Sequence, residues 1–226
     1  MNNFTLKLLA VLFMVIDHIG YFFIQNDYNS YFRYAGRLAM PIFFFLFVEG
    51  FMKTSNRKKH FCRLALYSIL MFAGNVVLYF TMRYRYPFHT NILFSMLICY
   101  VILLIIETDI QKWMKIFAML VLFGFSNFVE YGILTVLLTL LFYVYFKYEH
   151  FNKINLAGLY IAGSLLYCNL FSPQNQWFMV FALPFMLLYN GKQGYKSKIT
   201  QHGFYLFYIL HLWLFLIIRN LGFVIK

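Results

Sequence analysis

Nine apolar runs, separated by short polar breaks, occupy most of the chain. A helix that crosses a bilayer needs roughly 20 such residues, and a run of this kind without strand-like alternation favours a helix. The pattern predicts an all-α, polytopic membrane helical bundle of about nine transmembrane helices (8–10), as one domain over residues 1–226. The predicted spans are Phe4–Ile24, Leu38–Met52, Phe61–Met82, Ile92–Ile106, Ile116–Val129, Gly132–Phe146, Ile154–Phe171, Trp177–Tyr189 and Phe204–Ile218. A polar break at residues 126–132 leaves open whether the fifth and sixth runs form one discontinuous element.

The composition excludes an ordinary soluble domain. Of all residues, 63% are hydrophobic and only 12% are charged, whereas a soluble domain has about 25% charged residues. The net charge of +12 would suit a nucleic acid only on a water-exposed domain, for which no room remains. We therefore expect the lipid bilayer, and no nucleic acid, as a partner. The three cysteines show no ligand spacing, so we expect no metal site.

The positive charges favour a cytoplasmic N-terminus. Lys and Arg collect in cytoplasmic loops, and this orientation places thirteen of them inside and six outside. Five of the six outer ones are arginines, which bind carboxylate or phosphate better than lysine does. They could bind an anion or only contact lipid headgroups. The outer residues are Arg33, Arg37, Arg83, Arg85, Arg219 and Lys226.

Ionisable side chains at membrane depth are costly and therefore mark candidate functional residues. Five qualify: Asp17, His18, Glu49, Glu130 and His211. If they face the bundle interior, they form a polar column across much of the bilayer. The alternative is that they pair with one another, or with a nearby Lys or Arg, and hold helices together.

The spacing within the first run adds geometry. Lys7 and His18 are eleven residues apart, so they share one helix face at a separation of about 16 Å. A donor phosphate at Lys7 could then bring a thioester on a pantetheine arm near His18. Adjacent residues on a helix point about 100° apart, so we expect Asp17 to contact a neighbouring helix, through Arg37 or His211, rather than His18.

Several motifs together resemble the TraX family. They are LLAVLFMVIDHIGY at Leu8–Tyr21, GRLAMPIFFFLFVEGFMKTSNR at Gly36–Arg57, NIL from Asn91, YG at Tyr131–Gly132, YNGKQG at Tyr189–Gly194 and FYLFYILHL at Phe204–Leu212. They occur in the family's order over nearly the whole chain. Two positions depart from the family pattern, Ile209 in place of a proline and Glu130 in place of an aspartate.

The resemblance implies an acetyltransferase, because the family's namesake acetylates the N-terminus of pilin. It implies a bacterial cytoplasmic membrane, a cytosolic acetyl-CoA-type donor, and an envelope acceptor that is a peptide N-terminus or a glycan hydroxyl. For this reaction the candidate catalytic residues are His18 as base, His211 as alternative base or acid, Arg37 for developing charge or an anionic acceptor, and Asp17 and Glu49 as groups that orient the histidines. The implied donor-binding residues are Lys7, Asn91, Tyr189, Asn190, Gly191 and Gly194. A tight turn is the simpler interpretation of YNGKQG.

Two other functions stay open. A small transporter or channel could use the buried polar column for protons or a substrate. A non-enzymatic membrane component of a conjugation or secretion apparatus could use the same residues for assembly. Turnover of an acetyl donor distinguishes the first hypothesis from these two.

Overall fold

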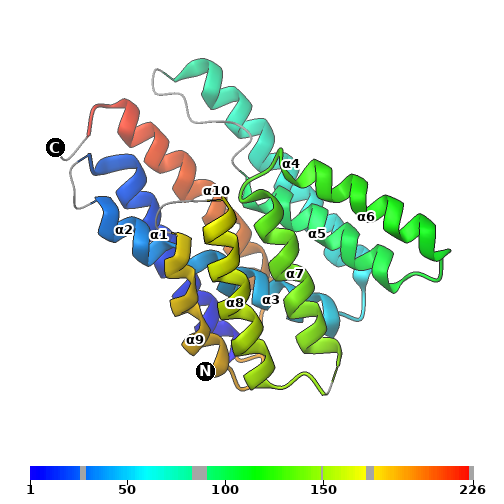
Figure 1. The fold of residues 1–226 in the computed structure, drawn as a ribbon. Coiled ribbons are helices and arrows are strands. Elements are labelled where there is room, and N and C mark those ends of the chain that lie inside the picture. Colours follow the sequence, from blue (N-terminus) through cyan, green and yellow to red (C-terminus); the bar gives the residue numbers. More distant parts are fainter. Residues whose placement is uncertain (26–28, 83–90, 149, 172–175, 224–226) are drawn as a thin grey trace. The chain divides into compact units, whose positions relative to one another are not determined.

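The computed structural model describes residues 1–25, 29–82, 91–148, 150–171 and 176–223, and these are mostly helical (Figure 1). Each of the nine apolar runs coincides with one or two of the helices, and their ends differ by six residues or fewer. The helices are α1 (Asn3–Phe23), α2 (Asn29–Gly36), α3 (Ala39–Lys53), α4 (Arg57–Thr81), α5 (Ile92–Glu107), α6 (Lys112–Ser126), α7 (Gly132–Lys147), α8 (Lys153–Phe171), the 3₁₀ helix η1 (Gln176–Ala182), α9 (Leu183–Leu187) and α10 (Lys198–Asn220).

Among the residues that the structure describes, five helical segments are long and apolar enough to cross a membrane. They are Asn3–Phe23, Tyr31–Lys53, Arg57–Thr81, Lys153–Phe171 and Ile199–Asn220. The chain is therefore a helical membrane protein. The count of nine spans stays a prediction, because α5, α7 and η1–α9 are shorter apolar helices. The cytoplasmic N-terminus also stays a prediction. Of the outer cations, Arg83, Arg85 and Lys226 lie outside the described residues.

Three features differ from a simple series of nine helices. Helix α2 was not predicted, because its sequence NSYFRYAG lacks an apolar run. The eighth run is a 3₁₀ helix that continues into a short α-helix at Leu183. The polar break after α6 ends in left-handed backbone at Tyr131, with φ of 60°, and Gly132, with φ of 48°. Helices α6 and α7 are consequently two separate helices.

The described chain divides into two compact units, with a boundary inside α3. The first comprises Met1–Leu46, Met82–Tyr84 and His150–Lys226, and the second comprises Phe47–Thr81 and Arg85–Glu149. The first therefore contains α1, α2, α8, η1, α9 and α10, and the second contains α4 to α7. The expectation of one domain over residues 1–226 stays a prediction.

In the first unit, α1 and α10 lie side by side and run in the same direction (Figure 1). Phe4 near the start of α1 contacts Phe204, with ring centroids 6.2 Å apart. Phe22 near its end contacts Phe215, also at 6.2 Å. Helix α2 packs against α1. The Tyr160 hydroxyl of α8 donates to the Met179 carbonyl of η1 at 2.5 Å.

In the second unit, buried polar groups join the helices by hydrogen bonds. Asn91 Nδ2, before α5, donates to the Ser68 carbonyl of α4 at 3.0 Å. Ser95 Oγ of α5 donates to the Glu130 carbonyl, before α7, at 2.8 Å. Such bonds hold helices together where lipid offers no partner for polar groups.

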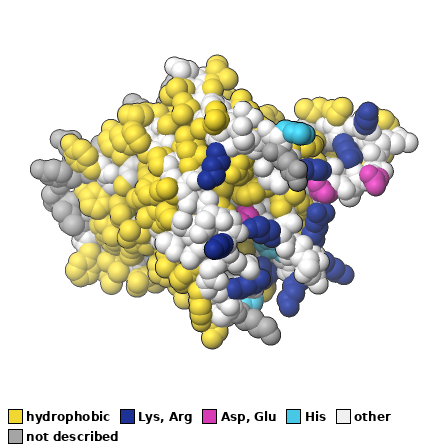
Figure 2. All heavy atoms as spheres, turned by 90° about the horizontal axis from the view of Figure 1, so that it is seen from below, with side chains coloured by type: hydrophobic (Ala, Val, Ile, Leu, Met, Phe, Trp, Pro, Cys, Tyr) yellow, Lys and Arg dark blue, Asp and Glu magenta, His cyan; other side chains and the backbone are white. Residues whose placement is uncertain are grey.

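Outward-facing apolar side chains are abundant in both units. Figure 2 shows hydrophobic side chains over large areas of the face in view. Exposed apolar patches of this extent are unusual for a soluble monomer and are expected where lipid surrounds the helices. On α4 they include Leu66, Ile69, Leu70, Phe72, Val77 and Phe80, and on α8 Ile154, Leu159, Ile161, Leu165, Leu166 and Leu170.

Candidate active site

The two histidines predicted at membrane depth contact each other. His18 Nδ1 of α1 lies 2.8 Å from His211 Nε2 of α10, and the ring centroids are 5.0 Å apart. His211 is buried, whereas His18 is only partly buried. Two residues 193 positions apart in the chain therefore form one imidazole pair.

Neighbouring groups determine which ring nitrogens carry protons. His211 Nδ1 lies 2.7 Å from the Phe207 carbonyl oxygen, which can only accept, so this nitrogen is the donor. In the neutral pair, His211 Nε2 then has a lone pair and accepts from His18 Nδ1–H. This leaves the lone pair of His18 on Nε2, the outer nitrogen of the pair. In this arrangement His211 fixes the tautomer of His18, and the free lone pair on Nε2 can accept a proton.

Aromatic rings surround this pair and fix the ring of His211. Phe207 stacks on His211 at 5.1 Å with an interplanar angle of 11°, and Phe215 meets the same ring edge-on at 5.7 Å. Phe22 lies 6.5 Å from the His18 ring. A proton acceptor held in an apolar setting interacts more strongly with nearby charges than it would in water.

Asp17 forms an ion pair with a residue that the sequence analysis did not place in the site. Its Oδ2 accepts from Arg33 Nη1 of α2 at 2.6 Å. The predicted partners are Arg37 and His211. Arg37 follows α2 at the turn before α3 and acts on Asp17 electrostatically, but the ion pair of Asp17 is with Arg33 instead. The expectation that Asp17 contacts a neighbouring helix is confirmed, and the residue it touches is Arg33.

Two glycines allow α2 to approach α1 closely enough for this ion pair. A Cβ added at Gly36 would overlap Cβ, Cγ and Oδ1 of Asp17, and one added at Gly20 would lie 2.6 Å from Cβ of Phe32. The position of Arg33 therefore depends on small residues on both helices. These glycines flank the polar segment that carries Arg33. They are the feature of the sequence that could have indicated a close approach of this segment to α1.

Several residues predicted to bind the donor lie together at the N-terminal end of α1. The backbone N–H of Asn190 donates to the Met1 carbonyl at 2.9 Å, and that of Asn3 donates to the Lys192 carbonyl at 2.9 Å. Lys7 Nζ lies over the Phe204 ring at 5.1 Å. The loop at Tyr189–Gly194 thus joins the same end of α1 as Lys7. Its glycines both have positive φ, 75° at Gly191 and 67° at Gly194, which fits the tight turn expected of YNGKQG.

Two other predicted site residues belong to the second unit. Glu49 is 2% exposed, and its Oε1 accepts from Lys53 Nζ at 2.6 Å, one turn along α3. Asn91 caps α5, since its Oδ1 accepts from the Phe94 N–H at 3.2 Å. Both have structural roles in that unit. Their roles in orienting the histidines or binding the donor stay predictions.

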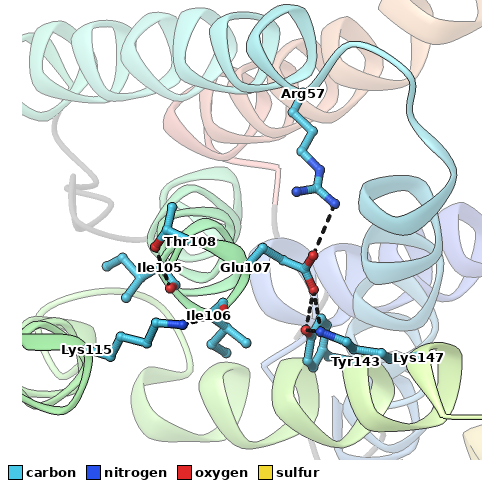
Figure 3. A network of polar contacts seen from close by, with 8 residues as sticks. All are labelled: Arg57, Ile105, Ile106, Glu107, Thr108, Lys115, Tyr143 and Lys147. Carbon is cyan, nitrogen blue, oxygen red and sulfur yellow. Dashed lines mark hydrogen bonds and ion pairs between the residues drawn. The ribbon is translucent and has the colours of Figure 1, made fainter. Parts of the chain in front are cut away.

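The second unit also contains an ion network that the sequence analysis did not identify. Figure 3 shows the Glu107 carboxylate, at the end of α5, between Arg57 of α4 and the Tyr143 hydroxyl and Lys147 amine of α7. Lys147 Nζ lies 2.8 Å from Oε1, and Arg57 Nη2 lies 3.5 Å from Oε2. Hydrogen bonds from Lys147 and Tyr143 lower the pKa of Glu107 to about 2. The network joins the ends of three helices.

The chain is similar to a known family and to a known protein. A family model described as TraX protein matches residues 3–219. A protein of Dichelobacter nodosus named "Probable fimbrial assembly protein FimC, serogroup H1" is 27% identical over 234 residues, covering 93% of each chain. No solved structure matches.

Proposed function

The chain belongs to the TraX family, and from this membership and the histidine pair we propose that it is an integral membrane acetyltransferase. It moves an acetyl group from a cytosolic acetyl-CoA-type donor to an envelope acceptor, and it acts in the bacterial cytoplasmic membrane. The observation that carries the proposal is the hydrogen-bonded chain from His18 through His211 to the Phe207 carbonyl. These two hydrogen bonds leave the lone pair of His18 on Nε2, where it can accept a proton.

The chemistry follows from that lone pair. An amine or hydroxyl of the acceptor loses its proton to His18 Nε2 as it attacks the thioester carbonyl carbon. When the carbon–sulfur bond breaks, His18 returns the proton to the leaving thiolate. His211 holds the proton on His18 Nδ1 throughout and disperses the positive charge of the transient imidazolium. The products are the acetylated acceptor and free CoA.

The residues at the N-terminal end of α1 support a donor site on that side. Lys7 lies eleven residues before His18, about 16 Å along the helix axis, and the Tyr189–Gly194 loop joins the same end of α1. With the phosphates of the donor near Lys7, an extended pantetheine arm reaches His18. His18 is partly buried, and in this proposal the acceptor reaches its Nε2 from the remaining exposed side.

The acceptor is proposed from the family and from the relative. The TraX resemblance implies pilin N-acetylation, and the Dichelobacter nodosus protein carries a name that refers to fimbrial assembly. We therefore take the N-terminus of a fimbrial or pilin-like subunit as the first acceptor to test, with glycan hydroxyls as the second.

The test uses protein purified in nanodiscs with labelled acetyl-CoA and an envelope extract from cells that lack the gene. The wild type should release CoA and transfer the label. His18→Ala should lower the rate by about 10²–10⁴-fold, the usual contribution of a positioned base. His202→Ala is the matched control, because His202 is an exposed histidine of the same α10 helix as His211, and it should leave the rate unchanged.

A conservative variant tests the tautomer argument separately. His211→Gln keeps an acceptor for His18 Nδ1–H, so it should retain more activity than His211→Leu, which offers none. Equal rates for wild type and His18→Ala, with both proteins folded, would contradict the enzyme. A proton or solute flux in proteoliposomes that needs no acetyl donor would favour a transporter instead.

A further inference from the structure

Arg33 is held beside Asp17, the residue that precedes the proposed base, by two contacts. Its Nη1 donates to Asp17 Oδ2 at 2.6 Å, and its guanidinium carbon lies over the Tyr21 ring at 5.3 Å. Asp17 directly precedes His18 on α1. The guanidinium is therefore held from two directions, by an ion pair and by an aromatic ring, both on the part of α1 that carries the proposed base.

The ion pair is better explained by function than by stability. Asp17 is 7% exposed, and burying a carboxylate and a guanidinium gives little net stability compared with apolar packing. Such a pair at membrane depth marks a functional residue by default. The pair does, however, fix the direction of one guanidinium and offset its charge.

Arg33 retains hydrogen-bonding capacity for a substrate. A guanidinium has five N–H donors, and the bond to Asp17 uses the Nη1 end. The Arg33 side chain keeps 22% of its surface exposed, compared with 10% for Asp17. The carboxylate thus forms the buried side of the pair, and the arginine forms the side that a bound substrate can reach.

Acyl transfer needs a positive donor at one particular atom. When the acceptor attacks the thioester, the electron pair of the C=O bond moves to oxygen and produces a tetrahedral oxyanion, which reforms the carbonyl as the C–S bond breaks. A fixed N–H donor near that oxygen lowers the barrier, and it is most effective where water is excluded. His18 takes the proton and cannot also stabilise this oxygen.

We propose that Arg33 is the oxyanion-stabilising catalytic residue and that Asp17 is its positioning residue; this inference rests on the proposed acetyltransferase function. Arg33 donates to the thioester oxygen as negative charge develops there. Arg37, for which the sequence suggested this role, follows α2 and reinforces the local positive charge. Helix α2, with Gly36 against Asp17, serves to bring Arg33 to α1.

The test compares Arg33→Gln, Arg33→Lys and Arg33→Ala with the wild type in the nanodisc assay, over a range of acetyl-CoA concentrations. Arg33→Gln should lower kcat by about 10²–10³-fold, the usual effect of removing one oxyanion donor, with little change in KM. Arg33→Lys keeps the charge without the planar fork and should lose less. Added guanidinium ion should restore part of the kcat of Arg33→Ala, which a merely structural role would not allow.

Lys112→Gln is the control, since it removes an exposed cation from the first turn of α6 and should leave kcat unchanged. A rise in KM with kcat unchanged in Arg33→Gln would overturn the inference, because Arg33 would then only bind substrate. Wild-type activity that is lost in His18→Ala and unaffected in a folded Arg33→Gln would overturn this inference alone. A wild type without acetyl transfer would overturn the proposed function as well.

Discussion

Replacing Gly36 by alanine should separate α2 from α1 and displace Arg33. The added methyl would overlap Cβ, Cγ and Oδ1 of Asp17, and Cβ cannot move without the α1 backbone. Ordinary contact distances begin at 3.4 Å, so the helices must part by about 1 Å. The Arg33–Asp17 contact of 2.6 Å would then exceed hydrogen-bonding distance unless the arginine side chain follows.

Two costs set the size of the effect. Overpacking costs about 1–3 kcal/mol, and leaving a buried charge without its partner costs about 3–5 kcal/mol. Parting of the helices relieves the overpacking but breaks the ion pair, so the two costs are alternatives rather than a sum, and we expect Gly36→Ala to lower the free energy of unfolding by about 3 kcal/mol. Acetyl transfer should fall along with it, because Arg33 no longer has a fixed position.

The assay is reversible unfolding in mixed micelles of increasing SDS content, followed by circular dichroism. Gly163→Ala is the matched control, because Gly163 lies within α8 and nothing lies within 4 Å of an added Cβ there. That change should be neutral or stabilising by about 0.5–1 kcal/mol, since alanine favours a helix more than glycine does. Unfolding of Gly36→Ala at the wild-type SDS fraction would refute the close approach of α2 to Asp17.

The remaining predictions concern charge, backbone and capping. Glu107→Gln should lower the free energy of unfolding at pH 7 by about 1 kcal/mol or less, as for exposed ion pairs. The pKa of Glu107 in the folded protein is lowered from 4.5 to about 2, so the difference in unfolding free energy between wild type and variant should shrink as the pH falls through that range. A difference that stays constant with pH would contradict the ion network. Gly194→Ala should reduce the melting temperature more than Gly191→Ala. Both glycines have positive φ, but only at Gly194 would an added Cβ lie 2.6 Å from Oδ1 of Asn2. Equal reductions in melting temperature would refute the contact between Gly194 and Asn2. Asn91→Ala should destabilise by about 1–2 kcal/mol through the lost cap. Asn91→Asp keeps the cap acceptor but places a buried carboxylate against the Ser68 carbonyl, so it should destabilise at least as much as Asn91→Ala at pH 7. An unchanged apparent KM for acetyl-CoA in a folded Asn91→Ala would argue against a donor-binding role.

The helices could be predicted from sequence because a bilayer forces the backbone to satisfy its own hydrogen bonds. The run from Phe4 and the run from Ile92 therefore became α1 and α5 with only small changes at their ends. Helix α2 could not be found in this way. It depends on packing against α1, which the apolar pattern of its own eight residues does not reveal.

The candidate site was only partly predictable. The cost of ionisable groups at membrane depth indicated Asp17, His18 and His211, but no local pattern specifies that α1 and α10 are neighbours. The pairing of His18 with His211 is consequently a result of the tertiary structure. Glu49 is different, because its partner Lys53 is four residues away, and that helical spacing alone predicts contact.

The central claim is that His18 acts as base in acetyl transfer to an envelope acceptor. Its most direct test is mass spectrometry of envelope peptides and glycans from cells that produce either the wild type or His18→Gln at equal levels in the membrane. The account predicts an acetyl group on an acceptor in wild-type cells and its absence with His18→Gln. Identical acetylation in the two strains would contradict it.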